Sequence, residues 1–93
     1  MSKKHYSSIW DAIEDTPQEA ASMRMRAELM IALQEYIKSS GMTQSQAANQ
    51  VGVTQPRISD LIRGKINLFS LESLVDMITG AGLIIEFSLK KAA

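Results

Sequence analysis

The sequence predicts a mainly α-helical protein that ends in one β-strand. Apolar residues recur every three or four positions through most of the chain, which is typical of helices packed around a common core. Near the C-terminus the apolar residues alternate strictly with others, which is typical of a half-buried strand. The alternating apolar residues are Leu83, Ile85, Phe87 and Leu89.

Length and composition favour one domain and argue against an enzyme. The chain has 93 residues, 45% of them hydrophobic, which suits a single packed core. We expect a flexible tail with a short acidic helix in residues 1–15 and a compact domain in residues 16–93. There is no cysteine, and the one histidine, His5, lies in the tail, so we expect no catalytic residue, metal site or cofactor. No apolar run is long enough to cross a membrane and the start lacks a signal peptide, so we expect a cytoplasmic protein.

Five helices are predicted, with boundaries set by capping residues and glycines. The first is short, Ile9 to Glu14. The second begins after Thr16, where Thr16-Pro17-Gln18-Glu19 has the pattern of a capping box, and runs to about Ser39 before Gly41. The last runs from about Leu71 to Thr79, with Ser70 before it and Gly80-Ala81-Gly82 after it.

The remaining two helices lie between Thr43 and Lys65 and are joined by a tight turn. Ala47 and Ala48 are small enough to let the two helices cross closely, and Gly52 suits the positive φ that often ends a helix. Thr54 is placed to cap the second helix. That helix has an apolar stripe and, opposite it, a polar face before Gly64. The stripe consists of Ile58, Leu61 and Ile62.

This pair resembles the Cro/C1-type helix-turn-helix of the XRE family. The resemblance covers roughly residues 27–81 and implies a lambda-repressor-like, five-helix DNA-binding domain. The residues that carry it are Thr43, Gln44, Ala48, Gly52, Gln55, Ile58, Leu61 and the ending Arg63-Gly64-Lys65. The longer arrangement, with the acidic segment WDAIEDTPQEAASM in front and a strand behind, resembles the small HigA-like antitoxins. That similarity implies a protein that represses its own operon and neutralises a small, basic, ribonuclease-like toxin.

The resemblance implies a DNA-binding role for the second helix of the pair. Net charge is zero, but residues 43–65 carry one acid against three cations, so a local patch could contact phosphate. The expected base-reading residues are Gln55, Pro56, Arg57, Ser59 and Asp60. The expected phosphate-binding residues are Thr43, Gln44, Thr54, Arg63 and Lys65. Two alternatives stay open: Asp60 could pair with Arg63, and Thr43 could serve only as a cap.

The C-terminal strand and the acidic N-terminal segment predict two protein partners. A lone strand leaves its backbone groups unpaired, so we expect the same strand of a second copy to pair with it through Leu83, Ile85, Phe87 and Leu89. Such a homodimer would bind double-stranded DNA at an inverted repeat. Trp10 either packs onto its own domain or anchors a toxin, together with Asp11, Glu14 and Asp15. A stand-alone phage-type repressor and a protein-interaction module without DNA binding are the alternative functions.

Overall fold

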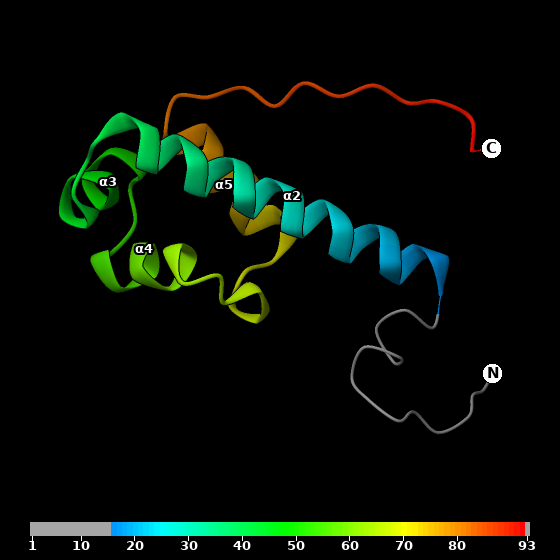
Figure 1. Ribbon diagram of the computed structural model, residues 1–93, viewed down its shortest axis with the longest axis horizontal. Coiled ribbons are helices and arrows are strands. Elements are labelled where there is room, and N and C mark those ends of the chain that lie inside the picture. The colour runs from blue at the N-terminus through cyan, green and yellow to red at the C-terminus, as the bar shows by residue number, and fades with distance from the viewer. Residues whose placement is uncertain (1–15, 93) are drawn as a thin grey trace.

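The computed structural model describes residues 16–92, and this part is built from helices (Figure 1). Its elements are α2 (Pro17–Ser40), α3 (Gln44–Val51), α4 (Gln55–Ile62), the single 3₁₀ turn η1 (Ile66–Leu68) and α5 (Leu71–Gly80). Four of the five predicted helices are therefore present close to their expected limits. The fifth, Ile9 to Glu14, lies outside the described residues, so the described part has four α-helices rather than the five expected.

The predicted caps set the helix limits. The Thr16 hydroxyl accepts a hydrogen bond from the Glu19 backbone N–H at 3.0 Å, which satisfies one free donor at the start of α2. Gly41 ends that helix with a φ of 75°, a left-handed conformation that glycine adopts without steric cost. Ser70 caps α5 in the same way as Thr16, by accepting from the Ser73 N–H.

The core lies where α2 crosses the other helices. α2 contacts α4, η1 and α5, while α3 packs against α4 and α5. The largest fully buried side chains come from α2, α4, α5 and the segment before α5, and they are Phe69, Leu33, Ile58, Leu61 and Leu74. The outward surface of α2 is mostly polar but includes the exposed side chains of Met25 and Ile31. No helix within residues 16–92 is long and apolar enough to cross a membrane.

A close contact between Gly80 and Val51 holds the end of α5 against the end of α3. A Cβ built on Gly80 would lie 2.3 Å from the Val51 carbonyl oxygen, so no larger residue fits without movement of the backbone. The sequence predicted Gly80 only as part of the helix-ending Gly80-Ala81-Gly82. The structure gives it a packing role, because the two helix ends approach through this glycine.

The predicted C-terminal strand is not present as a strand in the described residues. Residues 83–92 are extended and run back along α2, but beyond Leu83 none of them makes a backbone hydrogen bond to another described residue (Figure 1). The physical reason is that one copy of the domain offers no neighbouring strand to pair with. The predicted alternation is only partly seen: Leu83 and Ile85 are half-buried against the core, whereas Phe87 and Leu89 are 79% and 90% exposed.

Candidate DNA-binding surface

The turn between α3 and α4 has the geometry that the sequence predicts. Thr43 and Gln46 form a reciprocal capping box, in which the Thr43 hydroxyl accepts from the Gln46 N–H at 3.1 Å and the Gln46 amide oxygen accepts from the Thr43 N–H at 2.9 Å. Gly52 adopts a φ of 87°. Thr54 then caps α4 by accepting from the Arg57 N–H at 3.3 Å. These local hydrogen bonds fix where each short helix begins, and the packing of α3 against α4 holds the two helices together.

The capping box leaves two backbone N–H donors free at the start of α3. The N–H groups of Gln44 and Ser45, its first two residues, make no hydrogen bond to another described residue. Such groups, together with the helix dipole, suit an anion such as a phosphate. Thr43 is therefore a cap here, and any contact that it makes to a phosphate would add to that role.

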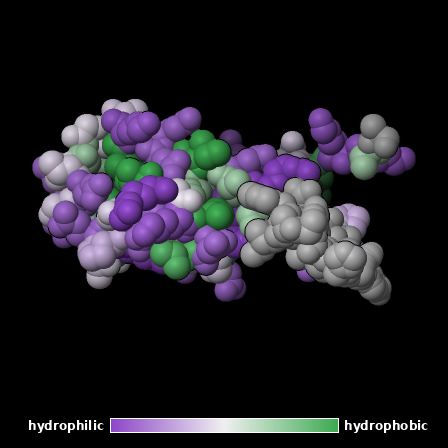
Figure 2. Space-filling view, turned by 60° about the horizontal axis from the view of Figure 1, so that its bottom comes forward, coloured by the Kyte–Doolittle hydropathy of each residue, from purple (hydrophilic) through white to green (hydrophobic). Residues whose placement is uncertain are grey.

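The exposed face of α4 lies at its N-terminal end and along one side. Gln55 and Pro56 are exposed, Ser59 and Asp60 are half-buried, and Arg63 just after the helix is exposed. Ile58 and Leu61 on the opposite side are fully buried, so the helix cannot rotate about its axis without losing core contacts. Figure 2, which brings the α4 side of the molecule forward, shows a mostly hydrophilic surface with isolated apolar patches.

Arg57 is directed toward the segment that joins α4 to α5. Its Nη1 donates a hydrogen bond to the Leu68 carbonyl oxygen at 2.7 Å, and its guanidinium lies 4.0 Å from the centre of the Phe69 ring. Arg26 of α2 approaches the same segment and donates to the Phe69 carbonyl at 3.4 Å. Arg57 is therefore already engaged within its own chain, and base reading by this side chain would require it to leave these contacts.

Asp60 pairs with Lys65 rather than with Arg63. The Lys65 Nζ and the Asp60 carboxylate are 3.8 Å apart, and the Lys65 N–H also donates to the Asp60 carbonyl at 3.1 Å. Arg63 makes no salt bridge among residues 16–92. Of the three cations between residues 43 and 65, only Arg63 is therefore without an intrachain partner among the described residues.

Two glutamines that the sequence pattern did not indicate join the helices behind this surface through hydrogen bonds. Gln34 of α2 donates from its Nε2 to the Leu61 carbonyl at 2.7 Å, close to the end of α4. Gln50 of α3 donates to the Tyr36 hydroxyl at 3.0 Å and to the Ala81 carbonyl at 3.2 Å. The signal for Gln34 was its place between the buried Leu33 and Ile37 stripe and the polar face, but a periodic pattern alone does not reveal a hydrogen-bond partner.

Apart from Arg57 and the α4 cap Thr54, the predicted DNA-contacting residues fall into three groups in space. Gln55, Pro56, Ser59 and Asp60 share the outer side of α4, Thr43 and Gln44 lie at the start of α3, and Arg63 and Lys65 follow α4. Arg57 points toward η1 and α5. The predicted toxin-binding residues, Trp10, Asp11, Glu14 and Asp15, lie outside the described residues. Within residues 16–92, no group of three or more His, Cys, Asp or Glu side chains is arranged to hold a metal ion.

Comparison with known proteins supports the helix-turn-helix assignment. A solved structure provisionally named an XRE-family transcriptional regulator matches with a TM-score of 0.71 and 27% sequence identity, covering 80% of this chain and 83% of its own. No curated protein matches the chain. The narrower similarity to HigA-like antitoxins is not shown and stays a prediction. The family model described as a helix-turn-helix domain matches residues 12–90, and the chain therefore belongs to the helix-turn-helix domain family.

Proposed function

We propose that this protein is a sequence-specific DNA-binding transcriptional repressor that places α4 in the major groove. The observation that carries the proposal is the division of α4 into a fully buried apolar side and an exposed polar side that starts with Gln55. A helix held in this way presents the same side chains in every molecule, which sequence reading requires. The match to an XRE-type regulator supports this function, and access to DNA agrees with the expected cytoplasmic location.

The proposed contacts follow from the chemistry of the exposed groups. Gln55 pairs with an adenine through its amide, and Pro56 contacts a thymine methyl group. The free N–H groups at the start of α3 and the Arg63 guanidinium bind phosphates, which position the helix without reading sequence. Asp60 accepts from a cytosine amino group while it stays paired with Lys65, because a carboxylate has several acceptor sites.

The proposal is tested by selecting binding sites from a random DNA library and measuring affinity for single-base variants of the selected site. Gln55→Ala should lower affinity for the best site by about tenfold to a hundredfold and relax preference at one base position, as expected for loss of a bidentate contact. Gln18→Ala, an exposed glutamine at the start of α2, is the matched control and should leave the profile unchanged. If the wild type selects no sequence, the protein-interaction alternative gains support.

We further propose that the repressor acts as a homodimer on an inverted-repeat operator. The exposed apolar side chains of the C-terminal segment, Phe87 and Leu89 among them, support a second copy as the partner. One copy alone offers a single recognition helix with one unengaged cation, Arg63, among residues 43–65. Two copies related by a two-fold axis would read two half-sites together and add their phosphate contacts.

An antitoxin role is the finer proposal and rests on the sequence of the N-terminal segment. Trp10 is a suitable anchor for a pocket, and Asp11, Glu14 and Asp15 would attract a basic toxin. A variant that lacks residues 1–15 should lose co-purification with a toxin encoded next to it while retaining operator affinity. Toxin binding by the truncated variant would move the partner surface onto residues 16–93, and the absence of a neighbouring toxin gene would favour the stand-alone repressor.

A further inference from the structure

The C-terminal segment exposes more apolar surface than its place on the domain explains. Ile84, Phe87 and Leu89 are 87%, 79% and 90% exposed. In contrast, Leu83 and Ile85 in the same segment pack onto the core. The segment is extended, and beyond Leu83 its backbone groups bond to no other described residue. An extended edge with free backbone groups and apolar side chains is a template for a second strand.

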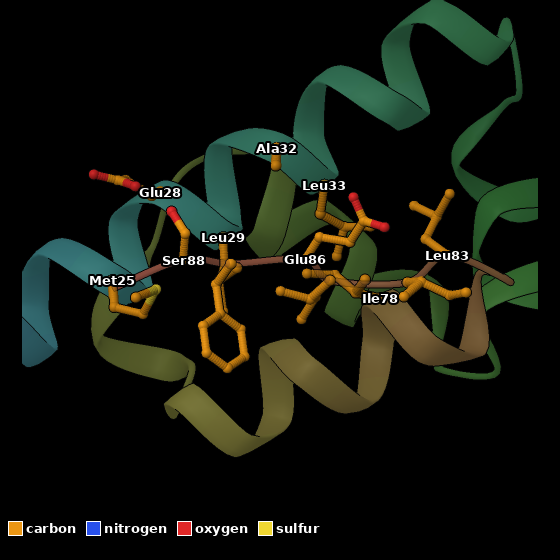
Figure 3. A pocket seen from close by; sticks show the side chains of 12 residues that line it. Met25, Glu28, Leu29, Ala32, Leu33, Ile78, Leu83, Glu86 and Ser88 are labelled. Atoms are coloured by element: carbon orange, nitrogen blue, oxygen red, sulfur yellow. The ribbon is translucent and has the colours of Figure 1, made fainter. Parts of the chain in front are cut away.

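A groove beside this segment continues the same apolar surface. It has a volume of about 620 Å³ and lies between the segment, α2 and α5 (Figure 3). Met25 and Leu29 of α2 line it on one side and Ile78 of α5 lies at its base, while Glu28 places a carboxylate on the α2 wall. Leu83 and Ile85 face these helices, so the odd-numbered residues of the segment define its inner face.

We propose that residues 83–92 of two copies pair as antiparallel strands with Ser88 on the two-fold axis. This register rests on the homodimer proposed above and specifies which residues meet. In an antiparallel pair centred on Ser88, Glu86 lies opposite Lys90 of the second copy, and Phe87 lies opposite Leu89 of the second copy. Each pair occurs twice because the interface is isologous. Opposite charges and aromatic–aliphatic pairs directly across a ladder are both favourable.

The neighbouring registers are less favourable because of their charges. An axis through Glu86 places two carboxylates directly opposite each other. An axis through Phe87 places Lys90 opposite Ile84, and an axis through Leu89 places Lys91 opposite Phe87, so neither forms an ion pair across the ladder. Registers centred between two residues would turn the two inner faces to opposite sides of the ribbon.

The Ser88 register also brings a lysine of the second copy toward the Glu28 carboxylate in the groove. It places Lys91 of the second copy opposite Ile85, on the inner face that turns toward α2. The aliphatic part of that lysine can lie along apolar surface while its ammonium group extends outward. Glu28 and Glu86 both line this groove, and Glu28 is the carboxylate on α2 that the ammonium group can approach, since Glu86 lies opposite Lys90 in this register.

Because the chain contains no cysteine, single cysteines can report the register directly. Opposed Cα atoms in an antiparallel pair are about 4.5 to 5.5 Å apart, within the range that a disulfide spans. Under mild oxidation Ser88→Cys should form a covalent dimer almost completely, whereas Phe87→Cys should do so at least about tenfold more slowly. Ile84→Cys is the control for random collision, because it is exposed on the outer face but far from its copy in this register.

A charge exchange provides the second arm. Glu86→Lys and Lys90→Glu should each raise the dissociation constant of the dimer about tenfold, and the double variant should restore it. Faster cross-linking through Phe87→Cys than through Ser88→Cys, in a protein that sediments as a dimer, would overturn the register but keep the dimer. A protein that sediments as a monomer at concentrations where it binds operator DNA would overturn both, and operator binding by itself would still test the repressor function.

Discussion

The Nη1 of Arg57 and the carbonyl oxygen of Leu68 are 2.7 Å apart, and this hydrogen bond connects α4 to the turn that leads into α5. The guanidinium also covers the Phe69 ring, whose side chain is almost fully buried. One side chain therefore connects the exposed surface to the core. The sequence predicts that Arg57 reads a base, but its contacts in the structure are those of a residue that positions α4.

Arg57→Ala should accordingly change affinity without changing specificity. Loss of the hydrogen bond and of the cation–π contact should lower the free energy of unfolding by about 1 to 3 kcal/mol, measured by urea denaturation. Affinity should fall by a similar factor for every operator variant, because α4 is less well positioned. Arg57→Lys keeps the charge but not the planar contact and should recover little. A change of preference confined to one base position would instead assign Arg57 to base reading.

Salt dependence should reflect how few cations are available near α4. The slope of log K against log[salt] is about −0.9 for each phosphate that a cation neutralises. Arg63→Ala should flatten this slope by about two units for a dimer, one for each copy, with equal losses on all sequences. Arg24→Ala, an exposed cation on α2, is the control and should leave the slope unchanged. No change with Arg63→Ala would place that residue away from the phosphates.

Gly80 and Gly52 should respond to alanine for different reasons. At Gly80 the added Cβ would collide with the Val51 carbonyl, so the helix ends must separate, at a cost of about 1 to 3 kcal/mol. At Gly52 there is open space, and the cost is the left-handed φ of 87°, about 1 to 2 kcal/mol. Gly52→Asn should recover part of the loss because asparagine tolerates this conformation, whereas Gly80→Asn should not. Thermal or urea unfolding of the four variants would test this difference.

The sequence predicted the local features of the fold because they depend on residues close together in the chain. The caps at Thr16, Thr43 and Thr54 and the turns at Gly41 and Gly52 follow from short-range chemistry and are confirmed. Contacts between distant residues were not predictable in the same way. The bond from Gln34 to Leu61 and the approach of Gly80 to Val51 join separate helices, and no local pattern reports them.

The C-terminal segment shows a second limit of the sequence pattern. Alternation predicted one buried face for all four odd-numbered apolar residues, but only Leu83 and Ile85 are close enough to α2 and α5 to be covered by their own chain. Periodicity reports which residues share a face and not how far the neighbouring surface extends. Phe87 and Leu89 lie where their own chain no longer covers the segment, and they are therefore exposed.

That limit identifies the substitution that best tests the dimer. Ile85→Lys would disturb the domain itself, because Ile85 already packs on the core. Leu89→Lys changes a side chain that is 90% exposed in one copy, so the helical circular dichroism and the unfolding free energy of the monomer should be unaffected. In the proposed dimer that position lies opposite Phe87 of the second copy, and a lysine there should weaken association, measured by sedimentation.

The same variant should separate the two levels of DNA recognition. A dimer reads half-sites about 34 to 36 Å apart, or a multiple of that distance, as one unit. Leu89→Lys should therefore bind the full inverted repeat hardly better than a single half-site, while its affinity for the half-site stays that of the wild type. Ile84→Lys is the matched control, because it adds the same charge on the outer face of the segment, and it should retain tight binding to the inverted repeat. If Leu89→Lys stays dimeric and binds like the wild type, the dimer contact lies elsewhere on the domain, and the exposed side of α2 around Ile31 is the next surface to mutate.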